Sequence, residues 1–197
     1  MTYVQTVPDD QAEGDVQAMY DADRKADGSV PNYTRAFSAR PAVYAAWKGL
    51  AGAVKAGMDP RRYELVSIAA ARRLRCSYCV LAHGTVTLKD GYFDEETLRA
   101  VVDDHQTSGL DEVDLAIMDL ADQIAADATA VTQEDVDRLR ELGLSDTEIF
   151  DVVAAATMRC FFAKTLDALG ARPDASFGAL APELREALTV GLPIAEA

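Results

Sequence analysis

Residues 63–84 read "YELVSIAAARRLRCSYCVLAHG", and the pattern of this stretch decides the fold class. Alanine, which has the highest helix propensity of all residues, occurs in a run, and apolar residues do not alternate with polar ones. The period of two that marks a half-buried strand is therefore missing. Pro60, directly after Asp59, suits the first turn of a helix. The pattern predicts two consecutive helices, over residues 60–74 and 77–89.

The same pattern extends along the rest of the chain. Alanine-rich runs recur in "LADQIAADA" and "VVAAATM". Thr132 with Asp135, and Ser145 with Glu148, have the spacing of capping boxes at helix N-termini. Further helices are expected over residues 13–26, 41–56, 94–104, 111–127, 133–142, 145–169 and 182–189. No linker or low-complexity tract interrupts them, so the sequence predicts an all-α protein with residues 1–197 in a single domain.

The composition is typical of a soluble globular protein and narrows the possible partners. Of the 197 residues, 49% are hydrophobic and 26% are charged, and the formal net charge is −14. This negative charge argues against binding to nucleic acid or to an anionic membrane surface. The N-terminal residues lack the features of a signal peptide, and no apolar run is long enough to span a bilayer. Three cysteines are too few for a disulfide framework, so a reducing cytoplasm is the expected location.

Two cysteines and a histidine in the opening stretch indicate redox chemistry. Cys76 and Cys79 lie three positions apart, so on a helix they share one side and are close enough to form a disulfide. The helix N-terminus favours a thiolate at Cys76. His83 lies one turn beyond Cys79, where an imidazole can accept the proton of that thiol. Glu64, on the preceding helix, can orient the imidazole if the two helices pack together. These residues predict a redox-active dithiol with a carboxylate–histidine proton relay.

Four further side chains surround the pair in the sequence. Arg72, Arg73 and Arg75 are expected to add positive charge near the thiols, which would favour a thiolate. Tyr78, between the two cysteines, either lines the site or packs in the core.

A zinc site is the main alternative to a dithiol. Structural zinc usually has four ligands, and the candidates beyond the cysteine pair are His83, His105 and Cys160. The chain has no second CxxC and no HxxxH motif, which disfavours zinc. His105 is expected at an exposed helix end, and Cys160 is expected as a small buried apolar residue. A purely structural cysteine pair also stays open.

The opening stretch has a weak internal echo, "TEIFDVVAAATMRCFFAKTLDA", at residues 147–168. The overlay pairs Glu64 with Glu148, Arg75 with Arg159, Cys76 with Cys160, Cys79 with Ala163, and His83 with Asp167. If the echo reflects a structural repeat, the fold contains two related helical units, each a pair of helices, and the second lacks the dithiol. Because Glu148 has no dithiol beside it, a purely structural role for Glu64 stays open as well.

The motif formed by Glu64, Cys76, Cys79 and His83 in an all-helical chain resembles the alkylhydroperoxidase D-like (AhpD-like) proteins of the carboxymuconolactone decarboxylase superfamily. The stretch "VPNYTRAFSARPAVYAAWKGL" is similar to the peroxidase-related branch of that group. The resemblance covers about residues 28–170. It implies a multihelical fold with repeated helical units, assembly into trimers or hexamers, and thiol-dependent reduction of hydrogen peroxide or organic hydroperoxides.

The resemblance also implies a role for each residue of the motif. Cys79 would be the peroxidatic cysteine, Cys76 the resolving cysteine, and Glu64 and His83 the proton relay. Tyr78 departs from the family, whose best-known members have a histidine between the cysteines. No cofactor or metal is expected, and electrons would come from a dithiol reductant such as a lipoyl-bearing or thioredoxin-like protein. A general dithiol–disulfide oxidoreductase with weak peroxidase activity, or a non-enzymatic helical oligomer with structural zinc, are the alternative functions.

Overall fold

A computed structural model describes residues 2–196 of the chain, and it contains helices but no strand within that range. The helices are α1 (Gly14–Asp27), α2 (Asn32–Ala36), α3 (Pro41–Gly57), α4 (Pro60–Arg73), α5 (Ser77–Lys89), α6 (Glu95–Asp104), α7 (Glu112–Asp127), α8 (Gln133–Glu141), α9 (Asp146–Leu169) and α10 (Pro182–Leu188). Short 3₁₀ turns lie at Asp9–Gln11, His105–Thr107, Ala128–Ala130 and Ala175–Ala179. The all-α prediction is confirmed, and every predicted helix is present with bounds within one residue of the prediction. The short helix α2 was not predicted.

Several helix N-termini are fixed by the local signals visible in the sequence. The Asp59 side chain accepts a hydrogen bond from the backbone N–H of Arg62, and Pro60 occupies the first turn of α4. Both predicted capping boxes are present, Thr132 with Asp135 at α8 and Ser145 with Glu148 at α9. Such caps satisfy N–H groups that have no partner inside the helix.

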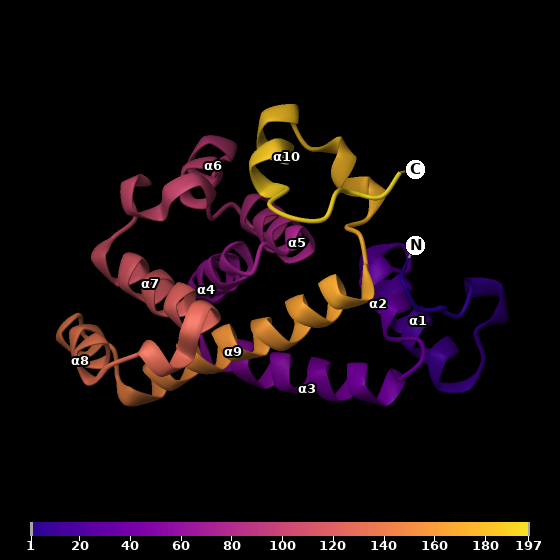
Figure 1. Ribbon diagram of the computed structural model, residues 1–197, viewed down its shortest axis with the longest axis horizontal. Coiled ribbons are helices and arrows are strands. Elements are labelled where there is room, and N and C mark those ends of the chain that lie inside the picture. Colours follow the sequence, from indigo (N-terminus) through magenta and orange to yellow (C-terminus); the bar gives the residue numbers. More distant parts are fainter. Residues whose placement is uncertain (1, 197) are drawn as a thin grey trace.

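Helix α4 forms the centre of the molecule. All of its residues from Tyr63 to Ala71 are buried, and it packs against α5, α7 and α9. Its opposite faces contribute to two hydrophobic clusters, one shared with α5 and the other with α7. Figure 1 shows α4 and α5 surrounded by α7, α9 and α10.

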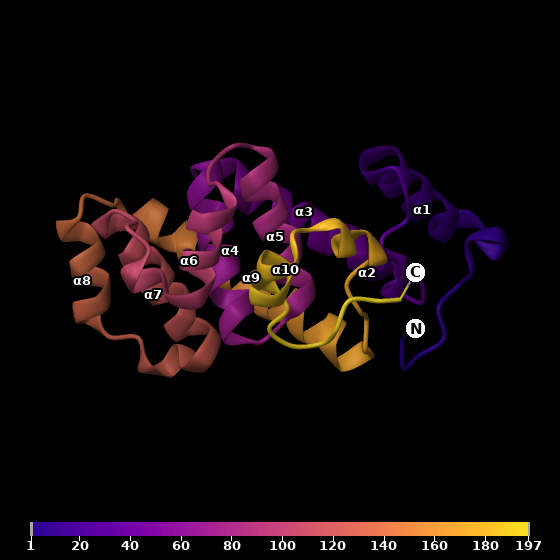
Figure 2. The same ribbon diagram turned by 90° about the horizontal axis from the view of Figure 1, so that it is seen from above.

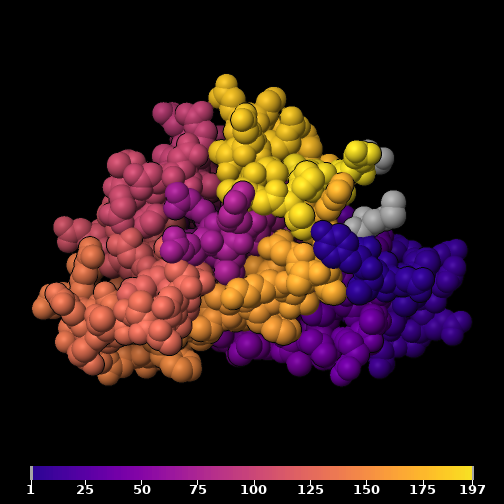
Figure 3. All heavy atoms as spheres, in the orientation of Figure 1, coloured from indigo at the N-terminus to yellow at the C-terminus, as the bar shows by residue number. Residues whose placement is uncertain are grey.

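The other helices enclose this centre from two sides. Helix α9 lies beside α3, and the two follow one edge of the molecule in Figure 1. Helix α10 packs on α5 and α6, and Figure 2 shows the C-terminal segment passing over this region. The space-filling view in Figure 3 shows the same segment covering one side of the molecule, with the N-terminal residues at one end. In the described part of the chain, no helix is both long enough and apolar enough to cross a bilayer.

The sharp turn between α4 and α5 sets the position of the cysteines. Arg75 has a φ of 59°, in the left-handed region that non-glycine residues rarely adopt. The backbone N–H of Cys76 still bonds to the carbonyl of Ala71, at 2.9 Å, which closes the end of α4. Cys76 therefore becomes the N-terminal cap of α5, and Cys79 lies in its first turn.

The internal echo does not correspond to a second helix pair. Residues 60–89 form two helices separated by the turn at Arg75, whereas α9 runs without a break through Arg159, the residue that the overlay aligns with Arg75. The echo is therefore no structural repeat of the α4–α5 pair, and the second helix pair that such a repeat would imply is not found in this segment. Arg159 keeps helical geometry and points into the core, where it is buried.

Candidate active site

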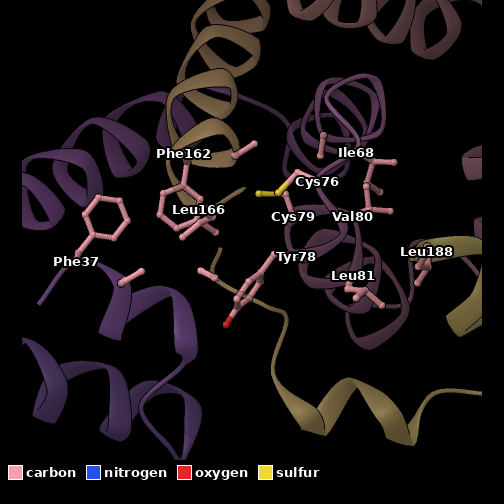
Figure 4. Close-up of a cluster of buried hydrophobic side chains, with 14 of the residues drawn as sticks. Phe37, Ile68, Cys76, Tyr78, Cys79, Val80, Leu81, Phe162, Leu166 and Leu188 are labelled. Carbon is pink, nitrogen blue, oxygen red and sulfur yellow. The ribbon is translucent and has the colours of Figure 1, made fainter. Parts of the chain in front are cut away.

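The two cysteines lie side by side in the core at the start of α5. Cys76 and Cys79 are 0% and 2% exposed, and both are free thiols. Figure 4 shows their sulfur atoms next to each other, on the side of α5 that faces Phe162 and Leu166 of α9. The predicted proximity of the two thiols at the start of a helix is confirmed.

The surroundings favour Cys79 as the thiolate of the pair. A hydrogen bond between the two sulfur atoms raises the pKa of Cys76, and burial raises it further. The same hydrogen bond lowers the pKa of Cys79, and the positive charge of Arg159 adds to this lowering, so that together they outweigh burial. The helix N-terminus alone would favour Cys76. The hydrogen bond and Arg159 reverse this order, because both stabilise negative charge on the sulfur of Cys79.

Glu64 and His83 form a close pair across the α4–α5 packing. An Oε2 atom of Glu64 lies 2.5 Å from Nδ1 of His83, and Nζ of Lys55 lies 3.1 Å from Oε1. Burial opposes ionisation of Glu64, but the hydrogen bond from His83 and the charge of Lys55 leave the pKa of Glu64 below the usual value. Burial lowers the pKa of His83 and the positive charge of Arg159 lowers it further, and together these effects outweigh the opposing effect of Glu64. The pair is therefore a carboxylate that accepts a hydrogen bond from a neutral imidazole.

This arrangement fixes which ring nitrogen of His83 can act as a base. A neutral imidazole has one N–H donor and one acceptor, and the donor at Nδ1 is used by the Glu64 carboxylate. The unprotonated Nε2 is then free to accept a proton. Among the described residues no hydrogen bond joins His83 to Cys79, so a proton passing between them needs a water molecule or an oxygen of the substrate as a bridge.

A cavity of about 290 Å³ brings these groups together. Cys79, Glu64 and His83 all line it, whereas Cys76 does not. Most of the wall is aromatic or small and apolar, formed by Tyr33, Trp47, Ala51, Gly52, Tyr63, Tyr78, Ala82, Val86 and Phe162, with Lys55 and Arg159 adding charge. The rings of Trp47 and Phe162 are stacked, with centroids 3.9 Å apart. The site is thus a thiol at the wall of a largely apolar pocket, and the Glu64–His83 pair lines the same pocket.

The positive charge at the thiols comes from a residue that sequence analysis did not assign to the site. Arg72 donates to the carbonyl of Asp103, Arg73 pairs with Asp122, and Arg75 donates to the carbonyl of Val190. These three side chains are engaged elsewhere, so the prediction that they supply charge to the thiols is wrong. Arg159 of α9 supplies it instead, since its Nη1 lies 3.9 Å from the sulfur of Cys79. Its alignment with Arg75 in the echo was the only signal for it.

The hydroxyl of Tyr78 is directed away from the two sulfur atoms (Figure 4). It donates a short hydrogen bond to Asp174 and accepts one from the backbone N–H of Tyr33 at 3.1 Å. Burial and the charge of Asp174 raise the pKa of Tyr78. The ring lines the cavity, but the hydroxyl is not placed to relay protons at the thiols.

The remaining zinc candidates do not gather around the cysteines. His105 is buried, contrary to the prediction of an exposed position, because its Nε2 atom bonds to Asp119 at 2.9 Å. Cys160 is half-buried on α9. No group of three or more His, Cys, Asp or Glu side chains within residues 2–196 has an arrangement that could hold a metal ion.

Comparison with known proteins agrees with this description. The family model of the carboxymuconolactone decarboxylase family matches residues 41–123, a range that includes the CxxC motif, Glu64 and His83. A peroxidase-related protein from Ralstonia eutropha JMP134, described as an alkylhydroperoxidase AhpD core, has a similar structure: the TM-score is 0.80 and the identity 21%, over 89% of this chain and 94% of that one. No curated protein sequence matches the chain.

Two further solved structures share the fold. A peroxidase-related protein from Silicibacter sp. TM1040 has a TM-score of 0.75 and 19% identity, over 89% of this chain and 91% of that one. The debrominase Bmp8, solved in complex with 2,3,4-tribromopyrrole, has a TM-score of 0.76 and 14% identity, over 95% of this chain and 98% of that one.

The chain has the same all-helical fold as the AhpD core structure, with the two cysteines buried inside it. The family match agrees with the resemblance found in the sequence: over residues 41–123, which carry the motif, the chain is similar to the carboxymuconolactone decarboxylase family.

Proposed function

We propose that the chain is a thiol-dependent peroxidase that reduces organic hydroperoxides, and also hydrogen peroxide, through Cys79 and Cys76. One observation carries this proposal: Cys79 lines a largely apolar cavity that the Glu64–His83 pair also lines, and the sulfur of Cys76 lies next to that of Cys79. A nucleophile, a base with its orienting carboxylate and a resolving thiol are the groups that such a reaction needs.

In the first step the Cys79 thiolate attacks one oxygen of the peroxide, and the O–O bond breaks. The sulfur loses two electrons and becomes a sulfenic acid, while the leaving oxygen becomes an alkoxide and takes a proton to form the alcohol. His83 accepts the proton lost in forming the thiolate, by way of a bridging oxygen, and returns it to the leaving group. Glu64 stabilises the imidazolium that exists between these transfers.

In the second step the Cys76 thiol condenses with the sulfenic acid. A disulfide between Cys76 and Cys79 forms, and water leaves. An external dithiol then reduces this disulfide by exchange and becomes oxidised itself. Because both sulfur atoms are buried, the reductant has to reach them through the cavity, which suits a slender arm such as a lipoyl group or an exposed dithiol of a thioredoxin-like protein.

The cavity wall favours an organic hydroperoxide over hydrogen peroxide. Aromatic side chains such as Trp47, Phe162 and Tyr63 offer apolar surface to the organic part of a substrate. Burying that part contributes binding energy of roughly 25 cal/mol per Å² of apolar surface. Hydrogen peroxide has no such part, so its affinity is expected to be lower.

Replacing Gly52 with leucine tests this preference. Gly52 lines the cavity, and a Cβ atom there meets no atom within 4 Å, so the leucine side chain can enter the cavity without disturbing α3. We expect KM for cumene hydroperoxide to rise about tenfold, which is the cost of losing about 1.4 kcal/mol of apolar contact, while turnover of hydrogen peroxide stays unchanged.

Gly49 provides the matched control for this experiment. It lies on the same helix, and a Cβ atom there also meets no atom within 4 Å, but it is not part of the cavity wall. Gly49→Leu should leave KM for both peroxides unchanged. Equal kinetic effects of the two leucines, or none from Gly52→Leu, would show that the organic substrate does not bind in this cavity.

Peroxide consumption assayed with several reductants tests the proposed function itself. The expected result is catalytic loss of cumene hydroperoxide with dithiothreitol, a lipoylated domain or thioredoxin as electron donor. Reduction of a disulfide substrate at a much higher rate than any peroxide would favour the general dithiol–disulfide oxidoreductase. Stoichiometric zinc in the purified protein, with no reaction of either kind, would favour a structural assembly protein.

We also propose that the protein acts as a homo-oligomer, a trimer or a hexamer, in a reducing cytoplasm. Large apolar side chains are exposed on neighbouring helices, Leu50 on α3 and Phe150 and Phe161 on α9, which supports self-association. Light scattering coupled to size-exclusion chromatography measures the stoichiometry, and a monomer at micromolar concentration would contradict this proposal.

A further inference from the structure

We propose that Arg159 of α9 is a further catalytic residue, the positive counter-charge that holds the sulfur of Cys79 as a thiolate. It lies outside the residues matched by the family model, which end at 123. The inference rests on the proposed function only for what the thiolate does next, since the thiolate itself can be measured without a peroxide.

Contacts of the guanidinium place it against the reacting sulfur. Arg159 is 3% exposed, and its Nη1 donates toward the sulfur of Cys79 at 3.9 Å. Its Nη2 lies 3.4 Å from the hydroxyls of Tyr63 and Ser67, both on α4. The guanidinium is therefore held by neutral hydroxyls from one helix while it faces the thiol of another.

The charge of Arg159 has no carboxylate partner among the described residues. Glu64, the acidic group on the same cavity wall, is already paired with Lys55 and His83. The Nε atom of Arg159 is also buried without a hydrogen-bond partner. A buried charge left without a counter-charge is strongly destabilising. Ionisation of Cys79 supplies the missing negative charge.

Other titratable groups near Cys79 do not replace Arg159 in this role. Cys76, at the start of the same helix, donates a hydrogen bond to Cys79 but carries no charge. Asp167 of α9 opposes a thiolate at Cys79, because both groups would be negatively charged. The same cavity is also lined by Glu64, His83 and Lys55. The negative charge of Glu64 and the positive charge of Lys55 offset each other, and the imidazole of His83 is neutral. Arg159 is thus the net positive charge that faces the sulfur.

The same guanidinium also acts on the base. Arg159 lowers the pKa of His83, after the larger effect of burial, and so keeps the imidazole neutral and able to accept a proton. One positive charge therefore favours both the thiolate and its proton acceptor in their reactive forms.

Alkylation of Cys79 by iodoacetamide as a function of pH tests the proposal. The pre-reduced protein is labelled at a series of pH values, and the rate at Cys79 is measured by peptide fragmentation in a mass spectrometer. Only the thiolate reacts, so the rate rises with pH through the thiol pKa. For the unmodified protein we expect a midpoint below that of a free cysteine, which is about 8.5.

Two substitutions remove the charge of Arg159 and one keeps it. Arg159→Met and Arg159→Gln should raise the midpoint by about 1 to 2 pH units, and so slow alkylation at pH 7 by at least about tenfold. Gln retains hydrogen-bonding capacity toward Tyr63 and Ser67, so at least one neutral variant is expected to fold. Arg159→Lys should restore most of the shift.

Arg75→Met is the matched control, since it removes one positive charge directly beside Cys76 from a side chain that points elsewhere. Its midpoint should equal that of the unmodified protein. A folded neutral variant of Arg159 with an unchanged midpoint, or an equal shift in Arg75→Met, would overturn the proposal, with folding checked by circular dichroism.

The outcome also separates this inference from the proposed function. A low midpoint that depends on Arg159 without any peroxide turnover would retain this inference and remove the proposed peroxidase function. Turnover with a midpoint independent of Arg159 would do the opposite.

Discussion

Peroxide turnover is expected to fall to the background rate when Cys79 is replaced with serine. A serine hydroxyl stays protonated at neutral pH and is a poor nucleophile toward oxygen, so the sulfenic acid cannot form. Cys76 cannot substitute for it, because its pKa is raised and it does not line the cavity. Loss of peroxide in the presence of excess dithiothreitol measures the effect.

Cys76→Ser should give a different defect. Its Cys79 still reacts once, so one equivalent of peroxide is consumed rapidly, but no disulfide forms and sustained turnover through the pair is lost. Cys160→Ser is the control, since Cys160 lies half-buried on α9 and is not in the cavity wall. Sustained turnover by Cys79→Ser, or loss of activity in Cys160→Ser alone, would show that the assignment of the peroxidatic cysteine is wrong.

Substitution of the relay should slow the reaction without unfolding the protein. Glu64→Gln removes the carboxylate that orients His83, and His83→Gln removes the base itself. General acid–base catalysis contributes about 10²- to 10⁴-fold, so we expect a loss of about 10²-fold in kcat for each variant. Because the two residues act as one unit, the double variant should be little slower than either single variant. Peroxide loss over a range of pH, with circular dichroism for folding, measures both points.

Glu148→Gln is the control that the internal echo provides. Glu148 aligns with Glu64 in the sequence, but its side chain caps α9 by bonding to the backbone N–H of Ser145 at 2.8 Å. Its substitution should cost at most about 1 kcal/mol of stability and leave turnover unchanged. Unchanged turnover in both Glu64→Gln and His83→Gln would reduce the pair to a packing role.

The helices could be predicted closely because their signals are local. Capping boxes at Thr132 and Ser145, and Pro60 in a first turn, depend on residues a few positions apart, and the structure keeps each of them. Helix α2 has only five residues, too few for a hydrophobic period to show. The break between α4 and α5 was predicted, but the left-handed backbone at Arg75 that forms it was not, because arginine rarely adopts that conformation.

In the candidate site, too, the local contacts could be predicted from the sequence and the long-range contacts could not. Cys76, Cys79 and His83 belong to one helix start, so their spacing alone brings them together, and Glu64 joins them through the packing of consecutive helices. Arg159 reaches Cys79 across 80 positions of the sequence, through the packing of α9 on α4 and α5. The burial of His105 against Asp119 is likewise a tertiary contact. The spacing of residues in the sequence does not predict such contacts.

Trapping the oxidised sulfur tests the central claim most directly. Cys76→Ser protein, in which the serine still offers a hydrogen-bond donor to Cys79, is treated with one equivalent of cumene hydroperoxide in the presence of dimedone. Peptide mass spectrometry then locates the adduct. We expect a dimedone adduct on Cys79 and, in the unmodified protein, a disulfide between Cys76 and Cys79 in its place. An adduct on Cys160, or no oxidation of Cys79 while the peroxide is consumed, would contradict it.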